Sequence, residues 1–204
     1  MRKIIYLILS VIFCSCSQTL NNEVEKDKLE SAISNSENIK DFNDKIFMNF
    51  RFGMSKDEVN DHFQMLLDSG KITLGTDGKF KYLFKTREGD ILTSFSTKYY
   101  DDRLCEFVVK FQKMNNEIYS SPELIMQFAQ DVFREKAINE GYDFYIDSIG
   151  TEHIYYYIKN ATIIKFSSFI EPYMAYICAP LCKMKNEKIE NEKENKVIDT
   201  ESDL

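Results

Sequence analysis

The cysteines are the residues whose type and spacing come closest to a chemical site in this chain. Cys178 and Cys182 flank the sequence Ala-Pro-Leu, and a turn at Pro180 brings sulfurs at this separation together. In an oxidising compartment the two are a candidate disulfide. Cys105 lies on the apolar face of an alternating segment, which favours a buried thiol, although pairing with either of the other two stays open. Three cysteines without a neighbouring histidine do not predict a zinc site.

Three consecutive tyrosines at positions 155–157 are the second candidate. Because side chains alternate between the two faces of a strand, Tyr156 is expected inside with Ile154 and Ile158, while Tyr155 and Tyr157 face outward. Exposed aromatic rings bind peptides, sugars and proteins well, since they offer a large contact area at low entropic cost. We therefore expect a binding surface at Tyr155 and Tyr157. The alternative is that another element covers these rings.

Groups suited to acid–base catalysis are few. His62 lies at the border of an apolar stripe and His153 at the start of a strand, and neither has a partner in a known motif. Asp101 and Asp102 lie between two strand-like segments, where turn hydrogen bonds are their expected role. Hydrolase, zinc-protease, P-loop and EF-hand motifs do not occur. We expect no enzyme, cofactor or metal site; the alternative is a hydrolase that acts through two carboxylates.

The elements that position these residues follow from hydrophobic patterning. With 204 residues, of which 44% are apolar, the chain has room for one domain with tails. Alternating segments predict strands, and two 3.6-residue stripes predict helices starting at Ser55 and Ser121. The result is an α+β domain at 46–182, with two helices packed on an antiparallel sheet of short meander strands in the order β-α-ββββ-α-βββ. The expected strands are 46–52, 71–75, 80–85, 91–99, 105–111, 154–158, 162–169 and 173–179.

Both helix starts carry capping residues. Ser55 with Glu58 three positions later forms a capping box, and Ser121 precedes Pro122 at the first helical position. A helix followed by hairpins is predicted twice along the chain, which is an approximate internal repeat of elements. Residues 16–45 are expected to be a flexible tether, in which Leu29 marks one short helix and which reaches about 100 Å when extended. Residues 183–204 mix both charge signs and predict a charged disordered tail.

The N-terminus predicts export. Arg2 and Lys3 precede ten largely apolar residues at 4–13, a helix of about 15 Å that is too short to cross a bilayer, so 1–15 reads as a signal peptide. Cys16, which follows Ser15, resembles the acylated cysteine of the bacterial lipoprotein lipobox. That resemblance implies a lipid on Cys16 and a membrane anchor, and Ser17 after it favours the outer membrane of a Gram-negative bacterium.

Two weaker features concern the partners and the location of the protein. The net charge of −7 repels phosphate backbones, so we expect no nucleic-acid partner. The stretch 52–59, from Phe52-Gly53-Met54 to Val59, resembles the helix start of BamE-like outer-membrane lipoproteins and of beta-lactamase-inhibitor-like periplasmic modules. We expect a membrane-anchored, non-enzymatic envelope lipoprotein that binds an unknown envelope protein or ligand; a structural or stress lipoprotein without a ligand is another alternative.

Overall fold

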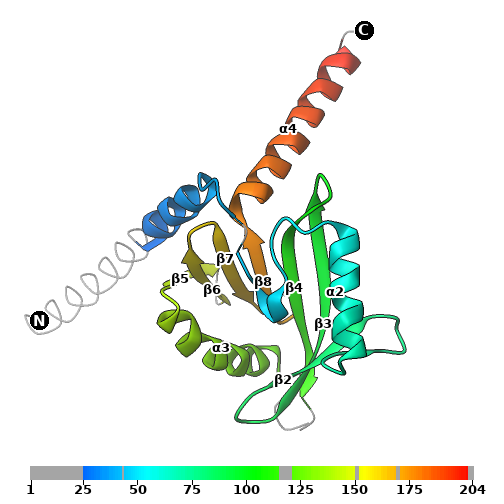
Figure 1. The fold of residues 1–204 in the computed structure, drawn as a ribbon. Helices are drawn as coiled ribbons and strands as arrows, with labels where there is room; N and C mark the ends of the chain where they lie inside the picture. The colour runs from blue at the N-terminus through cyan, green and yellow to red at the C-terminus, as the bar shows by residue number, and fades with distance from the viewer. Residues whose placement is uncertain (1–24, 43, 115–120, 150–151, 169–170, 202–204) are drawn as a thin grey trace, which may run out of the picture.

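One antiparallel sheet organises the computed structural model of the chain (Figure 1), which describes residues 25–42, 44–114, 121–149, 152–168 and 171–201. Within these residues the sheet has eight strands in the order β1-β2-β3-β4-β8-β7-β6-β5. The α+β class with an antiparallel sheet is confirmed. The strands are β1 Thr73–Leu74, β2 Phe80–Lys85, β3 Asp90–Tyr100, β4 Arg103–Met114, β5 Asp143–Ile149, β6 Glu152–Lys159, β7 Thr162–Ser167 and β8 Tyr173–Cys178.

The sheet consists of two four-stranded meanders that meet at β4 and β8. Helix α2 (Lys56–Asp68) precedes β1–β4, and helix α3 (Pro122–Asn139) precedes β5–β8, so the helix-then-hairpins repeat in the sequence corresponds to two similar halves. The halves join through antiparallel pairing at the centre of the sheet, where Val108 lies opposite Ala175. The sheet is therefore continuous across both halves.

The predicted caps of both helices are present. The Ser55 hydroxyl accepts a hydrogen bond from Glu58 N at 3.2 Å, and the Glu58 carboxylate accepts one from Ser55 N at 2.8 Å. Ser121 Oγ accepts from Leu124 N at 3.3 Å at the start of α3. These side chains satisfy backbone donors that have no partner inside a helix, which fixes where each helix begins.

The main core lies between α2, α3 and one face of the sheet. Phe63 of α2 and Ile125 of α3 are buried against it, and Phe107 of β4 and Tyr157 of β6 have no exposed surface. The centroids of the Phe50 and Phe107 rings are 4.7 Å apart. Aromatic rings thus fill much of the space between the helices and the sheet.

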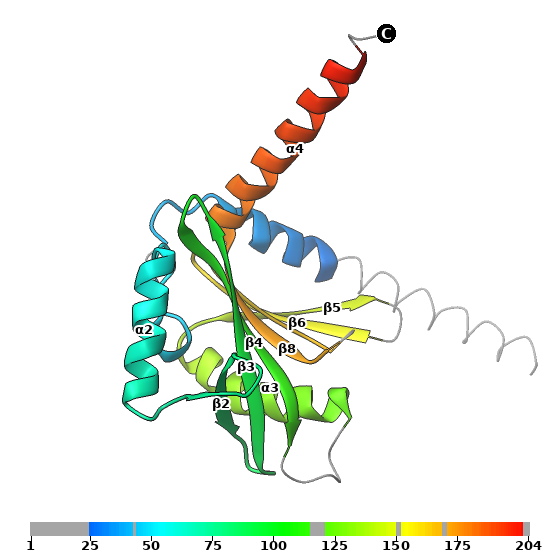
Figure 2. The same cartoon turned by 90° about the vertical axis from the view of Figure 1, so that its right-hand side faces the viewer.

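A second, smaller core lies on the opposite face of the sheet. Residues 25–37 are helical, and Leu29 packs there against Ile158, Ile163 and Ala179. In Figures 1 and 2 this blue helix and α3 lie on opposite sides of strands β5–β8. The expectation of a flexible tether over 16–45 is therefore wrong for this part of it, because an apolar face suffices to dock the helix.

Two further elements differ from the sequence expectation. Residues 46–52 do not form a strand: they contain a single 3₁₀ turn, η1 (Phe47–Asn49), and one isolated bridge pairs Lys45 with Arg51. Positive φ angles of 54° at Met48 and 66° at Asn49 break the extended backbone that the alternation suggested. Strand β5 at Asp143–Ile149 was not predicted, although it pairs with β6 along its whole length.

The charged C-terminal segment is helical. Helix α4 (Ala179–Glu201) begins at the end of β8 and projects away from the sheet (Figure 1), which corrects the expected disordered tail over 183–204 as far as Glu201. Its first turns are tied to the domain by ion pairs of Lys183 with Glu37 at 3.7 Å and of Lys188 with Asp101 at 3.6 Å. The lysines and glutamates of this segment are good helix formers, so a start fixed by β8 lets the helix propagate.

Candidate functional site

The binding surface expected at Tyr155 and Tyr157 is wrong for Tyr157. This side chain has no exposed surface: its ring meets Phe133 of α3 edge-on, with centroids 5.3 Å apart, and its hydroxyl accepts a hydrogen bond from Gln130 Nε2 at 3.4 Å. Tyr155 is half-buried and stacks on Phe144. The face of β6 that carries Tyr155 and Tyr157 was expected to point to solvent, but α3 covers it.

Tyr156 occupies the other face of the sheet, together with Ile154 and Ile158 as predicted from the alternation. Both isoleucines are buried there, and Tyr156 is half-buried. Burial, with smaller contributions from Asp147 and Tyr173, raises the pKa of Tyr156 to about 12. Strand β6 is thus covered on both faces, which is the alternative that the sequence analysis left open for these rings.

A groove lies on the face of the sheet opposite α2 and α3, and it is the strongest candidate site. It has a volume of about 660 Å³, within the range of ligand pockets. Its lining comes from strands β3, β4, β6, β7 and β8 and from Glu171 just before β8. We call it the sheet groove, and its residues are Ser96, Lys98, Glu106, Val108, Lys110, Ile154, Lys165, Ser167, Glu171 and Tyr173.

The floor and walls of the sheet groove differ in polarity. Val108 and Ile154 are buried at 7% and 6% exposure and provide an apolar floor, and Tyr173 adds a half-buried ring. Lysines and glutamates stand around them because alternate residues of each strand point to this face. An apolar base with a few convergent polar groups is the usual composition of a ligand site.

The charges of the sheet groove do not cancel. Lys98 Nζ lies 2.8 Å from Glu106 Oε2, and this hydrogen-bonded pair raises the pKa of Lys98. Lys110 Nζ lies 3.1 Å from Glu171 Oε2. Lys165, in contrast, makes no ion pair with the described part of the chain; its ammonium lies 5.9 Å from the centre of the Tyr156 ring. The groove therefore holds one uncompensated positive charge in a chain of net charge −7.

Lys165 is the residue that the sequence analysis missed. It lies within the strand Thr-Ile-Ile-Lys-Phe-Ser, in which all five of the remaining residues are buried. A single lysine inside such a strand is an unusual position for a charge, and this could have been noticed in the sequence. Which lysines meet across the sheet depends on the β4–β8 pairing, and that pairing joins segments far apart in the chain.

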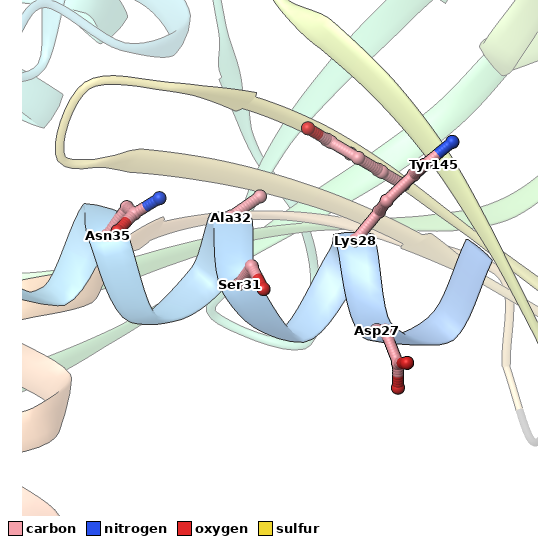
Figure 3. Close-up of a pocket in the computed structure, with 6 residues that line it drawn as sticks. All are labelled: Asp27, Lys28, Ser31, Ala32, Asn35 and Tyr145. Carbon is pink, nitrogen blue, oxygen red and sulfur yellow. The ribbon is translucent and has the colours of Figure 1, made fainter. Parts of the chain in front are cut away.

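A second hollow lies along the seam between the helical residues 25–37 and β5. It has a volume of about 460 Å³ and is wide open to solvent. In Figure 3 Lys28 extends across the seam toward Tyr145, whereas Asp27 points away. The lining is mostly small or polar and includes Ser31, Ala32 and Asn35, so this seam offers no enclosed apolar surface to a ligand.

The remaining polar candidates have local partners. His62 Nε2 lies 2.9 Å from the Met48 carbonyl oxygen, and His153 Nδ1 lies 2.9 Å from Ser148 Oγ at an exposed hairpin. Asp101 and Asp102 have positive φ angles at the β3–β4 turn, which confirms the turn expected there. Asp102 Oδ1 also accepts a hydrogen bond from Lys56 N at 3.2 Å and so supports the start of α2.

The three cysteines after residue 25 lie near one another around the junction of β8 and α4. All three are free thiols in the structure. The Cys105 thiol donates to the Lys98 carbonyl oxygen at 3.4 Å, and the Cys182 thiol donates to the Cys105 carbonyl oxygen at 3.6 Å. The predicted Cys178–Cys182 disulfide stays a prediction. Cys16 and the signal peptide at 1–15 lie outside the described residues.

Two other kinds of site are absent from the described residues. Helices of sufficient length and apolarity to span a bilayer do not occur among them. The same residues contain no cluster of three histidine, cysteine, aspartate or glutamate side chains arranged for a metal ion. Comparison with known proteins finds no matching family model, no matching curated protein and no matching solved structure.

Proposed function

We propose that this protein is a lipid-anchored envelope protein, without enzymatic activity, that binds an amphipathic anion in the sheet groove. The observation that carries the proposal is the uncompensated Lys165 ammonium beside an apolar floor of Val108 and Ile154. The ligand class is a small molecule with a carboxylate, sulfonate or phosphate group on an apolar or aromatic body. This replaces the tyrosine surface, since Tyr157 is buried.

The charge arrangement favours this ligand class over a neutral or cationic one. Lys98 and Lys110 are already paired with glutamates, so an anion would meet Lys165 without breaking an ion pair. The Tyr156 ring beside Lys165 and the Tyr173 ring offer flat apolar surface next to that charge. A half-buried ammonium binds an anion more strongly than a fully solvated one, because less water screens the pair.

Binding can be tested with anilinonaphthalene sulfonate, an aromatic anion whose fluorescence rises in apolar sites. We expect Lys165→Gln to weaken its binding about tenfold, the effect of losing one charge-assisted contact. Lys71→Gln removes an exposed lysine outside the groove and serves as the matched control. Phenylnaphthylamine, an uncharged counterpart, is expected to bind both variants like the unmodified protein. Equal affinity of the sulfonate for Lys165→Gln and the unmodified protein would reject the proposal.

The proposed location rests on the sequence. The partner of the N-terminal lipid is a membrane, and we propose that it is the outer membrane of a Gram-negative cell. The lipobox-like Cys16 after a short apolar segment supports acylation there. We expect Cys16→Ala to abolish palmitate labelling in cells and to move the protein from the membrane to the soluble fraction. Cys14→Ala is the control and is expected to leave both unchanged. If Cys14→Ala released the protein and Cys16→Ala did not, the lipid would be on Cys14.

A further inference from the structure

Cys105 and Cys182 face each other across the boundary between the sheet and α4. Cys105 lies in β4 and is buried, and Cys182 lies in the first turn of α4 and is partly exposed. The Cys182 thiol donates to the Cys105 carbonyl oxygen at 3.6 Å and is also within hydrogen-bonding reach of the Cys105 sulfur. Two elements far apart in the sequence thus bring two thiols together.

The two sulfurs are electrostatically unequal. The hydrogen bond from Cys182, together with the nearby Lys185 ammonium, lowers the pKa of the Cys105 thiol. The pKa of Cys182 is raised, because its thiol is the donor in that hydrogen bond and because it is partly buried. In the reduced form the Cys105 thiol donates to the Lys98 carbonyl oxygen at 3.4 Å, and ionisation of Cys105 breaks that hydrogen bond. A thiolate beside a thiol is the arrangement that thiol–disulfide exchange requires.

The third thiol is held differently. Cys178 has no exposed surface, and this burial raises the pKa of Cys178 to about 12. A small-molecule disulfide cannot reach a sulfur without exposed surface, whereas the Cys182 sulfur belongs to a partly exposed residue. This difference in access leaves Cys105 and Cys182 as the reactive pair.

We propose that Cys105 and Cys182 are a dithiol that closes to a disulfide in the presence of a small-molecule disulfide oxidant, fastening the first turn of α4 to β4. One sulfur of the pair attacks the oxidant, the oxidant S–S bond breaks, and one thiolate leaves. The other sulfur then attacks the mixed disulfide and releases the second thiolate. The protein loses two electrons and two protons, and the oxidant becomes two thiols.

The bond would act on the base of α4, where Leu181 already lies in the main core. Beyond its first turn α4 projects away from the sheet, and the ion pairs of Lys183 and Lys188 join exposed or half-exposed side chains. Surface ion pairs of this kind contribute little to stability. A covalent link at Cys182 would therefore add to the packing of Leu181 and fix the base of α4 to β4 more firmly than packing and ion pairs alone.

Peptide mapping of the full chain after treatment with oxidised glutathione tests the proposal. Trypsin places Cys105 in the peptide 104–110 and both other cysteines in the peptide 166–183. We expect these two peptides to become cross-linked under non-reducing conditions. Cys178→Ser is expected to keep the cross-link and Cys182→Ser to lose it, while the oxidised wild type melts several degrees above the reduced form.

The alternatives give different maps. A peptide 166–183 that is lighter by two hydrogens and not cross-linked would mean a Cys178–Cys182 disulfide, and a cross-link lost only in Cys178→Ser would mean a cross-strand bond. Thiols that all stay reduced would equally overturn the proposal. Chymotrypsin cuts after Tyr176 and Leu181, so it separates Cys178 from Cys182 in the unmodified chain should a serine variant fail to fold.

Discussion

Tyr157 shows how one side chain can join two layers of the fold. Its ring fills space between β6 and α3, and its hydroxyl pairs with the buried Gln130 amide. We expect Tyr157→Ala to lower the free energy of unfolding by about 3–5 kcal/mol, as truncation of a large buried ring does. Tyr157→Phe keeps the ring and is expected to cost only about 1 kcal/mol for the lost hydrogen bond. Urea unfolding measures both.

Tyr155→Ala is the matched comparison, since this ring is half-buried on the same face. It is expected to destabilise less than Tyr157→Ala. If Tyr157→Ala cost less than about 1 kcal/mol, the ring would have to be exposed after all, and the original binding surface would regain support.

Tyr156 makes the stability of the fold depend on pH at the alkaline end. Its pKa is raised to about 12 by burial first, against about 10 in an unfolded chain. The folded state holds this proton more tightly, so the contribution of Tyr156 is complete below pH 10 and is lost as the pH rises toward 12. Between pH 9 and 11.5 we expect Tyr156→Phe to lose less stability than the wild type, by roughly 1–2 kcal/mol.

Urea midpoints at several pH values check this difference. Tyr142 also has a pKa raised to about 12 by burial, so Tyr142→Phe should show a similar pattern. Parallel pH curves for the wild type and Tyr156→Phe would mean that the phenol is already solvated.

At the scale of elements, the helical residues 25–37 are held to the sheet mainly through Leu29, which is 4% exposed. We expect Leu29→Ala to weaken this docking by about 2 kcal/mol, because the second core is small. Amide hydrogen exchange in 25–37 should then be about thirtyfold faster, with exchange in β4 and β8 unchanged.

Ser34→Ala alters an exposed position of the same helix and should leave exchange as it is. If Leu29→Ala accelerated exchange equally in β4, the helix would belong to the global folding unit and not to a separately docking one.

Local signals predicted the elements better than the faces they present. Ser55 and Glu58 defined the start of α2, and Asp101 and Asp102 defined a turn, because each depends on neighbours in the chain. The alternation correctly predicts that Tyr156 shares a face of β6 with Ile154 and Ile158, but both faces of β6 are covered. Which face meets α3 depends on partners from other segments, and no alternation pattern encodes that.

The elements that were missed have physical reasons of the same kind. Residues 46–52 alternate like a strand, yet the positive φ angles at Met48 and Asn49 turn the chain into η1. The charged residues after Lys183 have the composition of a disordered tail, but β8 fixes the start of a helix there. Lys165 becomes part of the sheet groove only because β7 pairs with β8. The sequence alone does not predict that pairing, and so it does not predict the groove.

At the scale of the whole molecule, the two halves share one sheet and one core. The β4–β8 pairing runs from Glu106 opposite Ile177 to Lys110 opposite Tyr173, and the main core draws residues from both halves. We expect the fragments 25–114 and 121–201 to be unfolded when produced separately and to regain native circular dichroism when mixed. Each alone would expose a bare strand edge and its share of the apolar core.

The uncut chain is the reference and should unfold in a single urea transition. A monomeric fragment 121–201 with a cooperative melt of its own would show that the halves are independent domains.

The docked helix at 25–37 also sets how far the domain can stand from a bilayer. With a lipid on Cys16, the segment between the lipid and the docked helix would end at Glu25 and span at most about 30 Å, instead of the 100 Å of the whole segment 16–45. The helix rests on the same face of the sheet that carries the sheet groove. The groove would therefore stay within the layer of solvent next to the membrane surface. The molecules that reach it would be those that accumulate at that surface or dissociate from it.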